Sequence, residues 1–585
     1  MSSARPWLRA LCPIVVGALV LLTGCTGSDS GGSTGENQSN ATRTNAPFTL
    51  SYASSTEFNS YNNNTVNTAS VANAVVLNQV LRGFWYAGPQ GEVVPDQEFG
   101  TFEQVSSNPL TVRYTFDAKA KWSDGNPIDC DDAVLAWAAN SGRWPTRDRD
   151  PDTANKLTAF SSARPGAWSN VEPPKCADGD RTFTVTYDTV FADWSSMFGA
   201  GTILPAHIIE KESRVKDIIA AVKADSTKTM IKAGDIYNSL WLFKRGQYKT
   251  EVSPSAGPYQ VSEWQAGESI TLKPNPKWWG QAPKAASVVI RFIPQDQQVE
   301  ALRSGSVQVI DPLPTAELLT QLQEQGEPDD QVKFSMHDSF TWEHLDFNFD
   351  SQFKSKELRK AFAKCVPRQQ IVDNLIKPQN PTAEVLQSRF RLPFQPGYQE
   401  LIAGGQAYDK VDIAGAKKIL QAEGKVGTKV KIAYATPNPR RKAEVDLIRD
   451  FCGQAGFKVV DGGTTAFFGG SLLRGEFDVA LFAWTGSQLL TQGYATYLTK
   501  GAQNNGNYSN SQVDQLLKQL YSELNPANQR KLLAELDTAL WTDLATMPLF
   551  AFPALLATNA KVEGVVYNPS YSGVTFNVDD WSLKP

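Results

Sequence analysis

Hydrophobic and polar residues alternate in short blocks through the first half of the chain, and these blocks predict strands and helices in mixture. Residues 48–53 (FTLSYA), 110–117 (LTVRYTFD) and 182–188 (TFTVTYD) are predicted strands, the last two through their clear alternation. Residues 69–82 carry apolar side chains near helical spacing and predict a helix. Asp129 is a predicted N-cap of the helix that follows it.

The second half of the chain continues this mixture without a repeat. Its pattern predicts helices at 413–422, 440–454 and 528–544, and strands at 428–435 and 477–484. The segment 477–484 (FDVALFAW) is nearly continuous in apolar residues, as expected of a strand buried on both faces. Strands and helices mixed along the whole chain predict an α/β architecture, with α+β as the alternative.

The N-terminus has the pattern of a bacterial lipoprotein signal peptide. Arg5 and Arg9 precede an almost wholly apolar run at 11–22, which is too short to span a bilayer. The run ends in Leu-Thr-Gly-Cys25, which resembles the lipobox. We therefore expect a signal peptide at 1–24, lipid attached to Cys25, and a tethered rather than membrane-spanning protein.

Composition and charge argue against a nucleic-acid-binding function. The chain is 41% hydrophobic and 20% charged, as in ordinary globular proteins, and residues 25–47 are rich in small polar residues that predict a flexible linker. Loss of residues 1–24 removes two arginines and no acidic residue, and takes the net charge from −5 to −7. Without a basic surplus, nucleic-acid binding has no electrostatic basis.

The sequence carries no recognisable catalytic motif. HExxH, GxSxG, a Walker A sequence and GxGxxG before a helix are all missing, and the three histidines, His207, His337 and His344, are interpreted as structural. A Ser–His–Asp arrangement without GxSxG stays open, and so does a glycosidase-like carboxylate pair, because 61 acidic residues make chance pairs unavoidable. We expect no catalytic residues, no cofactor and no metal.

Several short motifs, taken together, resemble a known family. Residues 115–117 (TFD), 121–128 (KWSDGNPI) and 131–134 (DDAV) resemble the signature of the peptide-type extracellular solute-binding proteins, the dipeptide and oligopeptide receptors of ABC importers. Further similar segments follow in the family's order at 204–207, 255–259, 275–280, 301–305, 347–348, 358–362, 412–420, 477–484 and 507–514. Two positions depart from the family's pattern: Trp278 stands for a tyrosine and Pro367 for an aspartate.

The resemblance implies a two-lobe, periplasmic-binding-protein-like fold of type II, in the enlarged peptide-receptor class with an extra subdomain and a double hinge crossover. Lobe 1 would comprise 48–310 and 550–585, with the subdomain inserted at about 85–205, and lobe 2 would comprise 311–549. A monomer on the outer face of the cytoplasmic membrane would capture a peptide or peptide-like solute between the lobes. It would then deliver the solute to ABC permease subunits with their ATPase.

Cys12 is removed with the predicted signal peptide, and Cys25 is the predicted lipidation site. The mature chain then has four other cysteines, namely Cys130, Cys176, Cys365 and Cys452. An even number in an exported chain favours disulfides, with buried free thiols as the alternative. The widely spaced positions without CxxC argue against zinc. Chain order suggests the pairs Cys130–Cys176 and Cys365–Cys452, because each pair then falls within one proposed lobe.

The end of the strand at 477–484 is the strongest candidate for solute contact. The resemblance makes Trp484, followed by Thr485, a residue that lines the cleft. In relatives an aspartate that binds the peptide's α-ammonium follows, and here Ser487 takes its place. Because a hydroxyl supplies no countercharge, the resemblance suggests N-blocked or cyclic peptides, glycopeptides, or a peptide-like or sugar-like metabolite.

The same resemblance implies further candidate cleft residues, each with a structural alternative. The loop residues Asn63, Asn64 and Thr65 either contact the solute or belong to a solvated loop. Arg474 either binds a carboxylate of the solute or is a surface residue. The phenylalanines either line the pocket or belong to the core. These candidates are Asn63, Asn64, Thr65, Phe467, Phe468, Arg474, Phe550 and Phe552.

Two other classes of function compete with the importer receptor. A receptor-like lipoprotein with a regulatory or envelope-assembly role would need a protein partner and no transport. An enzyme would lose its chemistry, but not its binding, when one cleft carboxylate is replaced.

Overall fold

The computed structural model describes residues 48–149, 156–163, 166–323, 331–487 and 489–584. The predicted signal peptide at 1–24, the linker at 25–47 and the lipidation site Cys25 lie outside these residues. In the part of the chain that is described, no helix is both long and apolar enough to cross a membrane.

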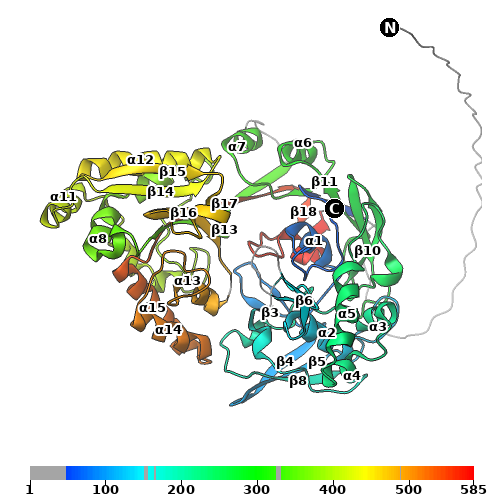
Figure 1. Cartoon of the computed structure of the whole chain (residues 1–585). Helices are drawn as coiled ribbons and strands as arrows, with labels where there is room; N and C mark the ends of the chain where they lie inside the picture. Colours follow the sequence, from blue (N-terminus) through cyan, green and yellow to red (C-terminus); the bar gives the residue numbers. More distant parts are fainter. Residues whose placement is uncertain (1–47, 150–155, 164–165, 324–330, 488, 585) are drawn as a thin grey trace, which may run out of the picture. The chain divides into compact units, whose positions relative to one another are not determined.

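One ten-stranded mixed sheet runs through the molecule (Figure 1), in the order β15-β14-β16-β13-β17-β12-β1-β11-β10-β9. Its strands are β1 (Thr49–Ser54), β9 (Tyr259–Gln265), β10 (Ser269–Pro274), β11 (Ser287–Phe292), β12 (Val309–Ile310), β13 (Val332–Phe347), β14 (Lys429–Ala435), β15 (Lys458–Thr464), β16 (Val479–Thr485) and β17 (Thr546–Asn559).

The long strands β13 and β17 join the two ends of this sheet. They pair antiparallel from Val332 opposite Asn559 to Asp346 opposite Thr546, with a register shift between Asp338 and Trp342. One end of β17 also pairs with β12, whereas β16 pairs with the other end of β13. The chain therefore crosses twice between two α/β halves, and an irregular register lies midway along the crossing. This arrangement confirms the predicted two-lobe fold with a double crossover.

The hydrophobic side chains form separate clusters on the two sides of this crossing. The largest cluster contains side chains of β1, β5 (Leu110–Phe116), β9, β10 and β11. A second cluster contains side chains of β14, β16, α8 (Lys356–Cys365), α12 (Pro439–Ala455) and the C-terminal half of β13. Separate cores are what two independently packed lobes require. The residue boundaries proposed for the lobes stay predictions.

Among the described residues of the predicted inserted subdomain are a small antiparallel sheet, helix α2 (Cys130–Asn140) and two short 3₁₀-helices (Gly166–Asn170 and Trp194–Ser196). The sheet is formed by β4 (Gly100–Ser107), β5 (Leu110–Phe116) and β8 (Thr182–Thr186). Asp129 caps α2 (Cys130–Asn140) as predicted, in a capping box in which Asp132 accepts a hydrogen bond from the Asp129 backbone N–H. Other elements of the first half are α1 (Val71–Leu77), β2 (Trp85–Ala87), β3 (Val93–Pro95), α3 (Ala206–Ser213), α4 (Ile218–Lys223), α5 (Thr227–Ser239), α6 (Gln298–Arg303) and α7 (Ala316–Gln323).

Helix α1 is shorter than the predicted helix at 69–82. Ser70 caps its start, and beyond Leu77 the polar side chains bind the C-terminal segment of the chain. The Gln79 amide donates hydrogen bonds to the carbonyls of Thr575 and Phe576. Tertiary hydrogen bonds therefore replace the last helical turns that the apolar spacing predicted.

The helices of the second half lie close to their predicted limits. Helix α11 spans Ile413–Ala422, α12 spans Pro439–Ala455 and α15 spans Pro526–Asp543, whereas α14 (Ser511–Ser522) was not predicted. Asn438 caps α12 by accepting a hydrogen bond from the Arg441 N–H, and Pro439 occupies the first turn, where no N–H is needed. Figure 1 shows α12 lying along β14 and β15.

Both predicted disulfides are present. Cys130 bonds to Cys176 with 6.1 Å between their Cα atoms, and Cys365 bonds to Cys452 with 4.9 Å between theirs. Each bridge lies on one side of the crossing strands and so braces a single half of the molecule.

Candidate functional site

A row of aromatic side chains covers one face of the β13–β16 pair. Trp342 lies opposite Trp484, and His344 lies opposite Phe482. Because directly opposed residues point to the same face of a sheet, all four rings lie together. The ring centroids of Phe482 and Trp484 are 5.0 Å apart, and those of His344 and Phe482 are 4.4 Å apart. We call these four residues the aromatic row.

The aromatic row contains polar nitrogen atoms that lack partners. Within the described residues, the buried indole Nε1 of Trp484 and both ring nitrogens of His344 have no hydrogen-bond partner. Asp346 Oδ1 lies 3.5 Å from His344 Nε2. An unsatisfied buried donor costs about 1–3 kcal/mol, so the Trp484 N–H would gain from an incoming acceptor.

The predicted residues Phe467 and Phe468 extend the row toward the surface. Phe467 is fully buried, whereas Phe468 is 55% exposed, and both rings pack against Phe482. Arg474, further along the same segment, is exposed and pairs with Glu476 at 2.6 Å. The structure therefore brings both phenylalanines to the aromatic row, while the arginine forms a local surface ion pair.

The residues after β16 form a tightly bonded turn. Thr485 is exposed, and its hydroxyl lies 3.3 Å from that of Thr341 on β13. The Ser487 N–H donates to Gln492 Oε1 at 2.7 Å, and the Ser487 hydroxyl accepts from the Leu489 N–H at 3.2 Å. Ser487 thus lies three residues after Trp484 with its hydroxyl bonded within the turn, and its role in solute binding stays a prediction.

The loop between β2 and β3 packs against the crossing strand β13 beside the aromatic row. Gly91 has φ of +79°, and a Cβ atom there would lie 2.2 Å from Phe340 Cζ. The Gln395 amide also donates to the Gln90 carbonyl at 3.3 Å. Glycine is required at position 91 both by the backbone conformation and by this close approach. Sequence reasoning did not identify this contact.

The predicted residues Phe550 and Phe552 lie on β17 beside a buried charge network. The Arg440 guanidinium lies 5.3 Å from the Phe550 ring and 4.7 Å from the Phe552 ring. Glu343, fully buried, accepts from Arg440 at 2.9 Å and from Arg441 at 2.7 Å. Phe550 is fully buried in the lobe 2 core and Phe552 is partly exposed.

Glu444 completes this network. It pairs with Arg440, and burial together with the charge of Glu343 raises the pKa of its carboxyl. Paired arginines offset the cost of burying both glutamates, as buried charges require. Sequence reasoning missed the network, because its members come from β13 and α12, far apart in the chain.

The predicted loop residues Asn63, Asn64 and Thr65 are bonded within lobe 1. The Asn63 amide donates to the Tyr571 hydroxyl at 2.9 Å, and the Asn64 amide donates to the Gly201 carbonyl at 2.8 Å. Thr65 is buried, and its hydroxyl lies 2.8 Å from that of Thr68. These contacts give the three residues a role in holding their loop, and a role in solute binding stays a prediction.

Two further carboxyl groups lie at the crossings between the lobes. Asp311 follows β12 and accepts a hydrogen bond from the Tyr52 hydroxyl at 2.5 Å, and burial raises its pKa to about 7. Asp338 lies at the register shift of β13, where burial raises its pKa to about 6. Next to it, the His337 ring stacks on Tyr567 with 4.5 Å between centroids. Sequence reasoning did not identify either aspartate.

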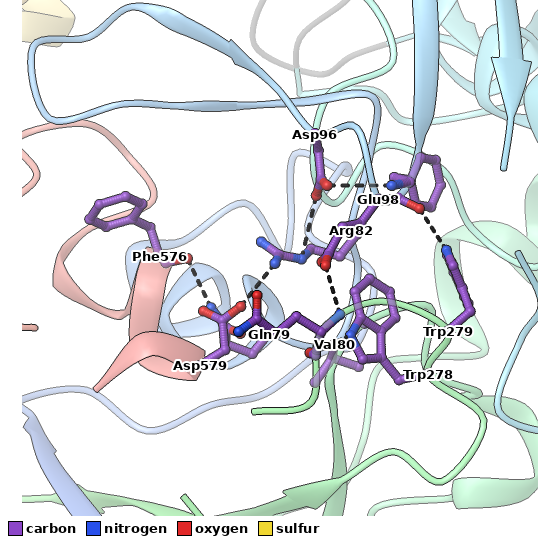
Figure 2. A network of polar contacts seen from close by, with 12 residues as sticks. Gln79, Val80, Arg82, Asp96, Glu98, Trp278, Trp279, Phe576 and Asp579 are labelled. Atoms are coloured by element: carbon purple, nitrogen blue, oxygen red, sulfur yellow. Dashed lines mark hydrogen bonds and ion pairs between the residues drawn. The ribbon is translucent and has the colours of Figure 1, made fainter. Parts of the chain in front are cut away.

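A separate pocket of about 270 Å³ lies in lobe 1, around Arg82. Figure 2 shows Arg82 between Asp96 and Asp579, with ion-pair distances of 3.4 Å and 2.9 Å. Burial raises the pKa of both aspartates, and their attraction to Arg82 opposes this rise. Trp279 donates to the Glu98 carbonyl in the same network. These contacts fasten the C-terminal segment to lobe 1, and the residues that line the pocket include none of the aromatic row.

The histidines are built into structural contacts. His207 lies 2.8 Å from Asp124, while His337 and His344 pack against aromatic rings. Among the residues with a described position, no three or more His, Cys, Asp and Glu side chains are grouped so that they could hold a metal ion. The site offers aromatic surfaces and hydrogen-bonding groups, which suit binding.

Comparison with known proteins agrees with this picture. An uncharacterized lipoprotein of Mycobacterium bovis is 29% identical over 98% of this chain and 97% of its own length. The oligopeptide-binding protein OppA of Mycobacterium tuberculosis is 26% identical over 85% of this chain and 78% of its own. Among solved structures, the periplasmic EDTA-binding protein EppA has the same fold, with a TM-score of 0.73 at 20% identity, covering 92% of this chain and 97% of EppA.

The family itself is established by a direct match. The model of the bacterial extracellular solute-binding proteins, family 5 Middle, matches residues 96–506, which is more than half of the chain. The family is described as solute-binding, and OppA and EppA are both named as binding proteins. The chain therefore belongs to family 5 of the bacterial extracellular solute-binding proteins.

Proposed function

We propose that this protein captures a peptide or peptide-like solute between its two lobes and delivers it to the permease of an ABC importer. The observation that carries the proposal is the aromatic row beside the crossing strands, with its unsatisfied Trp484 N–H. Flat aromatic faces bind varied apolar side chains at low entropic cost, and the N–H suits a backbone carbonyl of the solute. The similarity to OppA supports a peptide-like solute.

The turn after β16 narrows the proposed solute class. Ser487 supplies no countercharge at the position next to the row, and its hydroxyl already accepts the Leu489 N–H. A free α-ammonium enclosed there would be desolvated without a paired carboxylate. The site therefore suits N-blocked or cyclic peptides, glycopeptides or another peptide-like metabolite better than free linear peptides.

The proposal also includes the localisation of the protein at the cell membrane. The Leu-Thr-Gly-Cys25 sequence and the similarity to named lipoproteins support lipidation at Cys25 after removal of residues 1–24. Lipid on this cysteine would hold a monomeric receptor at the outer face of the cytoplasmic membrane, with residues 25–47 as a flexible tether.

The decisive experiment identifies the solute directly. The full chain would be purified from its membrane, and small molecules released by denaturation would be identified by mass spectrometry. A Trp484→Ala variant, purified in parallel, should release far less of the same molecule. Recovery of a peptide-like compound from the wild type supports the proposal.

A thermal-shift screen provides the second arm. Free-amine peptides, N-acetylated peptides, cyclic peptides and polycarboxylate chelators would be added separately, because a ligand that binds the folded state raises the melting temperature by mass action. Stabilisation by blocked or cyclic peptides is expected. Stabilisation by chelators alone, together with a non-peptide molecule in the first arm, would overturn the assignment to peptide-like solutes.

A further inference from the structure

The side chain of Asp193 connects the inserted subdomain to lobe 2. Its Oδ1 accepts from the Leu490 N–H at 2.9 Å, and its Oδ2 accepts from the Thr491 N–H at 3.0 Å and the Thr491 hydroxyl at 2.7 Å. Asp193 is only 7% exposed although it carries a carboxylate. A buried carboxylate with three donors from a segment about 300 positions away is a built contact, not a chance surface pair.

The three donors belong to the start of a short 3₁₀-helix. This helix spans Leu490–Gly493, and Leu489 at its N-cap position has an apolar side chain that cannot accept a hydrogen bond. The first N–H groups of a helix have no partner inside the helix and are usually satisfied by a neighbouring polar side chain. Here Asp193 supplies that cap from the inserted subdomain.

Neighbouring residues reinforce the same contact. The Ala192 N–H donates to the Tyr521 carbonyl at 2.7 Å, and the rings of Phe191 and Tyr521 lie 5.2 Å apart. Tyr521 belongs to α14 and also packs against Tyr494, just after the 3₁₀-helix. Three consecutive residues of the subdomain therefore contact two different elements of lobe 2.

We infer that Asp193 is a latch that holds the inserted subdomain against lobe 2 in the closed form of the protein. The inference rests on the proposed closure of the two lobes around a solute. Opening would remove the cap from the Leu490 and Thr491 N–H groups and expose them to water, which can replace Asp193 as acceptor. The contact consists of few, replaceable hydrogen bonds, so it can release and re-form with each binding cycle.

Hydrogen–deuterium exchange on the full chain without added solute tests the latch directly. In the wild type, the amides of Leu490, Thr491 and Ala192 should be protected. Asp193→Ala should raise exchange at all three amides by tenfold or more, and Asp193→Asn, which keeps one acceptor oxygen, should have a smaller effect. Asp188→Asn is the matched control: it removes the same charge from an exposed aspartate five residues earlier and should change none of them.

A reciprocal variant separates a latch from a local cap. Thr491→Val removes one hydroxyl from lobe 2 and leaves the chain around Ala192 intact, so a several-fold rise in exchange at Ala192 is expected only if the two contacts open together. Amides within β11, such as that of Ile290, should stay protected in every variant if the fold is intact.

Two outcomes would overturn the inference. In the first, Asp193→Ala leaves the Leu490 and Thr491 amides as protected as in the wild type. In the second, these amides exchange faster while Ala192 is unaffected by Thr491→Val, which would reduce Asp193 to a local cap. Because no solute is used, a negative result here leaves the mass-spectrometric test of the proposed function untouched.

Discussion

The imidazole of His344 lies nearly parallel to the indole of Trp484, with 5.9 Å between ring centroids and 8° between ring planes. His344 is fully buried on β13, whereas Trp484 is partly exposed near the end of β16. The His344 ring therefore packs against one face of the Trp484 indole, whose side chain stays partly exposed while its N–H is buried without a hydrogen-bond partner among the described residues.

Replacing Trp484 should weaken solute binding without unfolding the protein. Trp484→Phe keeps an aromatic ring but removes the N–H, so we expect affinity for the co-purified solute to fall roughly fivefold to tenfold, the value of one hydrogen bond. Trp484→Ala should lose considerably more, because the aromatic surface also disappears. Isothermal titration calorimetry with the identified solute measures both losses.

The control for this series is Trp278→Phe. Trp278 is a partly exposed tryptophan of lobe 1 whose ring lies 5.8 Å from the Arg82 guanidinium carbon (Figure 2), and it is not part of the aromatic row. Its replacement should leave affinity unchanged. Equal losses for the two tryptophans would place the solute elsewhere.

Introducing a carboxylate at Ser487 should change the preference for the solute's amine. Ser487→Asp can still accept the Leu489 N–H and adds a negative charge beside the aromatic row. A charge-assisted hydrogen bond contributes about 1.5–3 kcal/mol, so binding of a free-amine peptide should improve roughly tenfold or more relative to its N-acetylated form. Competition assays with the two peptides measure the ratio.

Ser511→Asp serves as the control for charge alone. Ser511 is an exposed serine at the start of α14, and its replacement should leave the ratio of the two affinities unchanged. An unchanged ratio in Ser487→Asp as well would remove Ser487 from the solute site.

Local sequence signals predicted much of the fold. The helix at 413–422 ends where α11 ends, Asp129 caps α2, and both cysteine pairs are bonded as chain order suggested. These features depend on local capping, apolar spacing and chain order. The helix predicted at 69–82 was too long, because its second half is bound by the C-terminal segment some 500 positions away, which spacing alone does not reveal.

The candidate site was also predictable only in part, because some of its contacts join residues that are far apart in the chain. Trp484 and Ser487 lie on one strand and its following turn, so motif resemblance could locate them. The contacts of Gly91 with Phe340 and of Asp193 with Thr491 join segments about 250 and 300 positions apart. A glycine or aspartate in a loop carries no signal of a partner at that distance, and only the packed fold reveals one.

Gly91→Ala should destabilise the contact between the β2–β3 loop and β13. A methyl group at this position would meet the Phe340 ring at 2.2 Å, which adds an overpacking cost of about 1–3 kcal/mol to the cost of positive φ. Gly179→Ala is a close control, since Gly179 has φ of +77° but no atom within 4 Å of the added methyl. Urea unfolding should therefore show a larger loss for Gly91→Ala.

A second variant tests the cause of that loss. Phe340→Leu shortens the side chain facing Gly91, so it should recover part of the stability lost by Gly91→Ala when the two are combined. Additive losses in the double variant, or equal losses at Gly91 and Gly179, would contradict a steric contact between Gly91 and Phe340.

The two disulfides should differ in their sensitivity to reductant. Both sulfurs of Cys365–Cys452 are fully buried in the lobe 2 core, whereas Cys176 is partly exposed. Thiol–disulfide exchange requires access to a sulfur atom. Mild reductant on the folded protein should therefore open Cys130–Cys176 first, and alkylation with peptide mass spectrometry identifies the thiols. Simultaneous alkylation of all four cysteines without denaturant would show that the lobe 2 core opens readily.

Asp311 should make stability depend on pH in a defined direction. Burial raises the pKa of its carboxyl from 3.8 to about 7, so the folded protein binds this proton more tightly than the unfolded chain does. Stability should consequently fall as pH rises from about 4 to about 7, and stay level above that range. Asp311→Asn removes the titration while keeping an oxygen that can accept the Tyr52 hydroxyl. The variant should match the wild type near pH 4 and exceed it at pH 8, by at most about 4 kcal/mol.

Asp373→Asn is a comparison variant, because the contribution of Asp373 to stability should change with pH in the opposite direction to that of Asp311. Asp373 is exposed, and its hydrogen bond to Lys377 lowers the pKa of its carboxyl, so any stability it contributes is present at neutral pH and lost in acid. Urea midpoints measured from pH 4 to pH 8.5 would distinguish the two variants. If Asp311→Asn lowers stability at pH 8 by as much as at pH 4, the Asp311 carboxylate is not destabilised by burial, and the charge at this crossing must be neutralised by a partner.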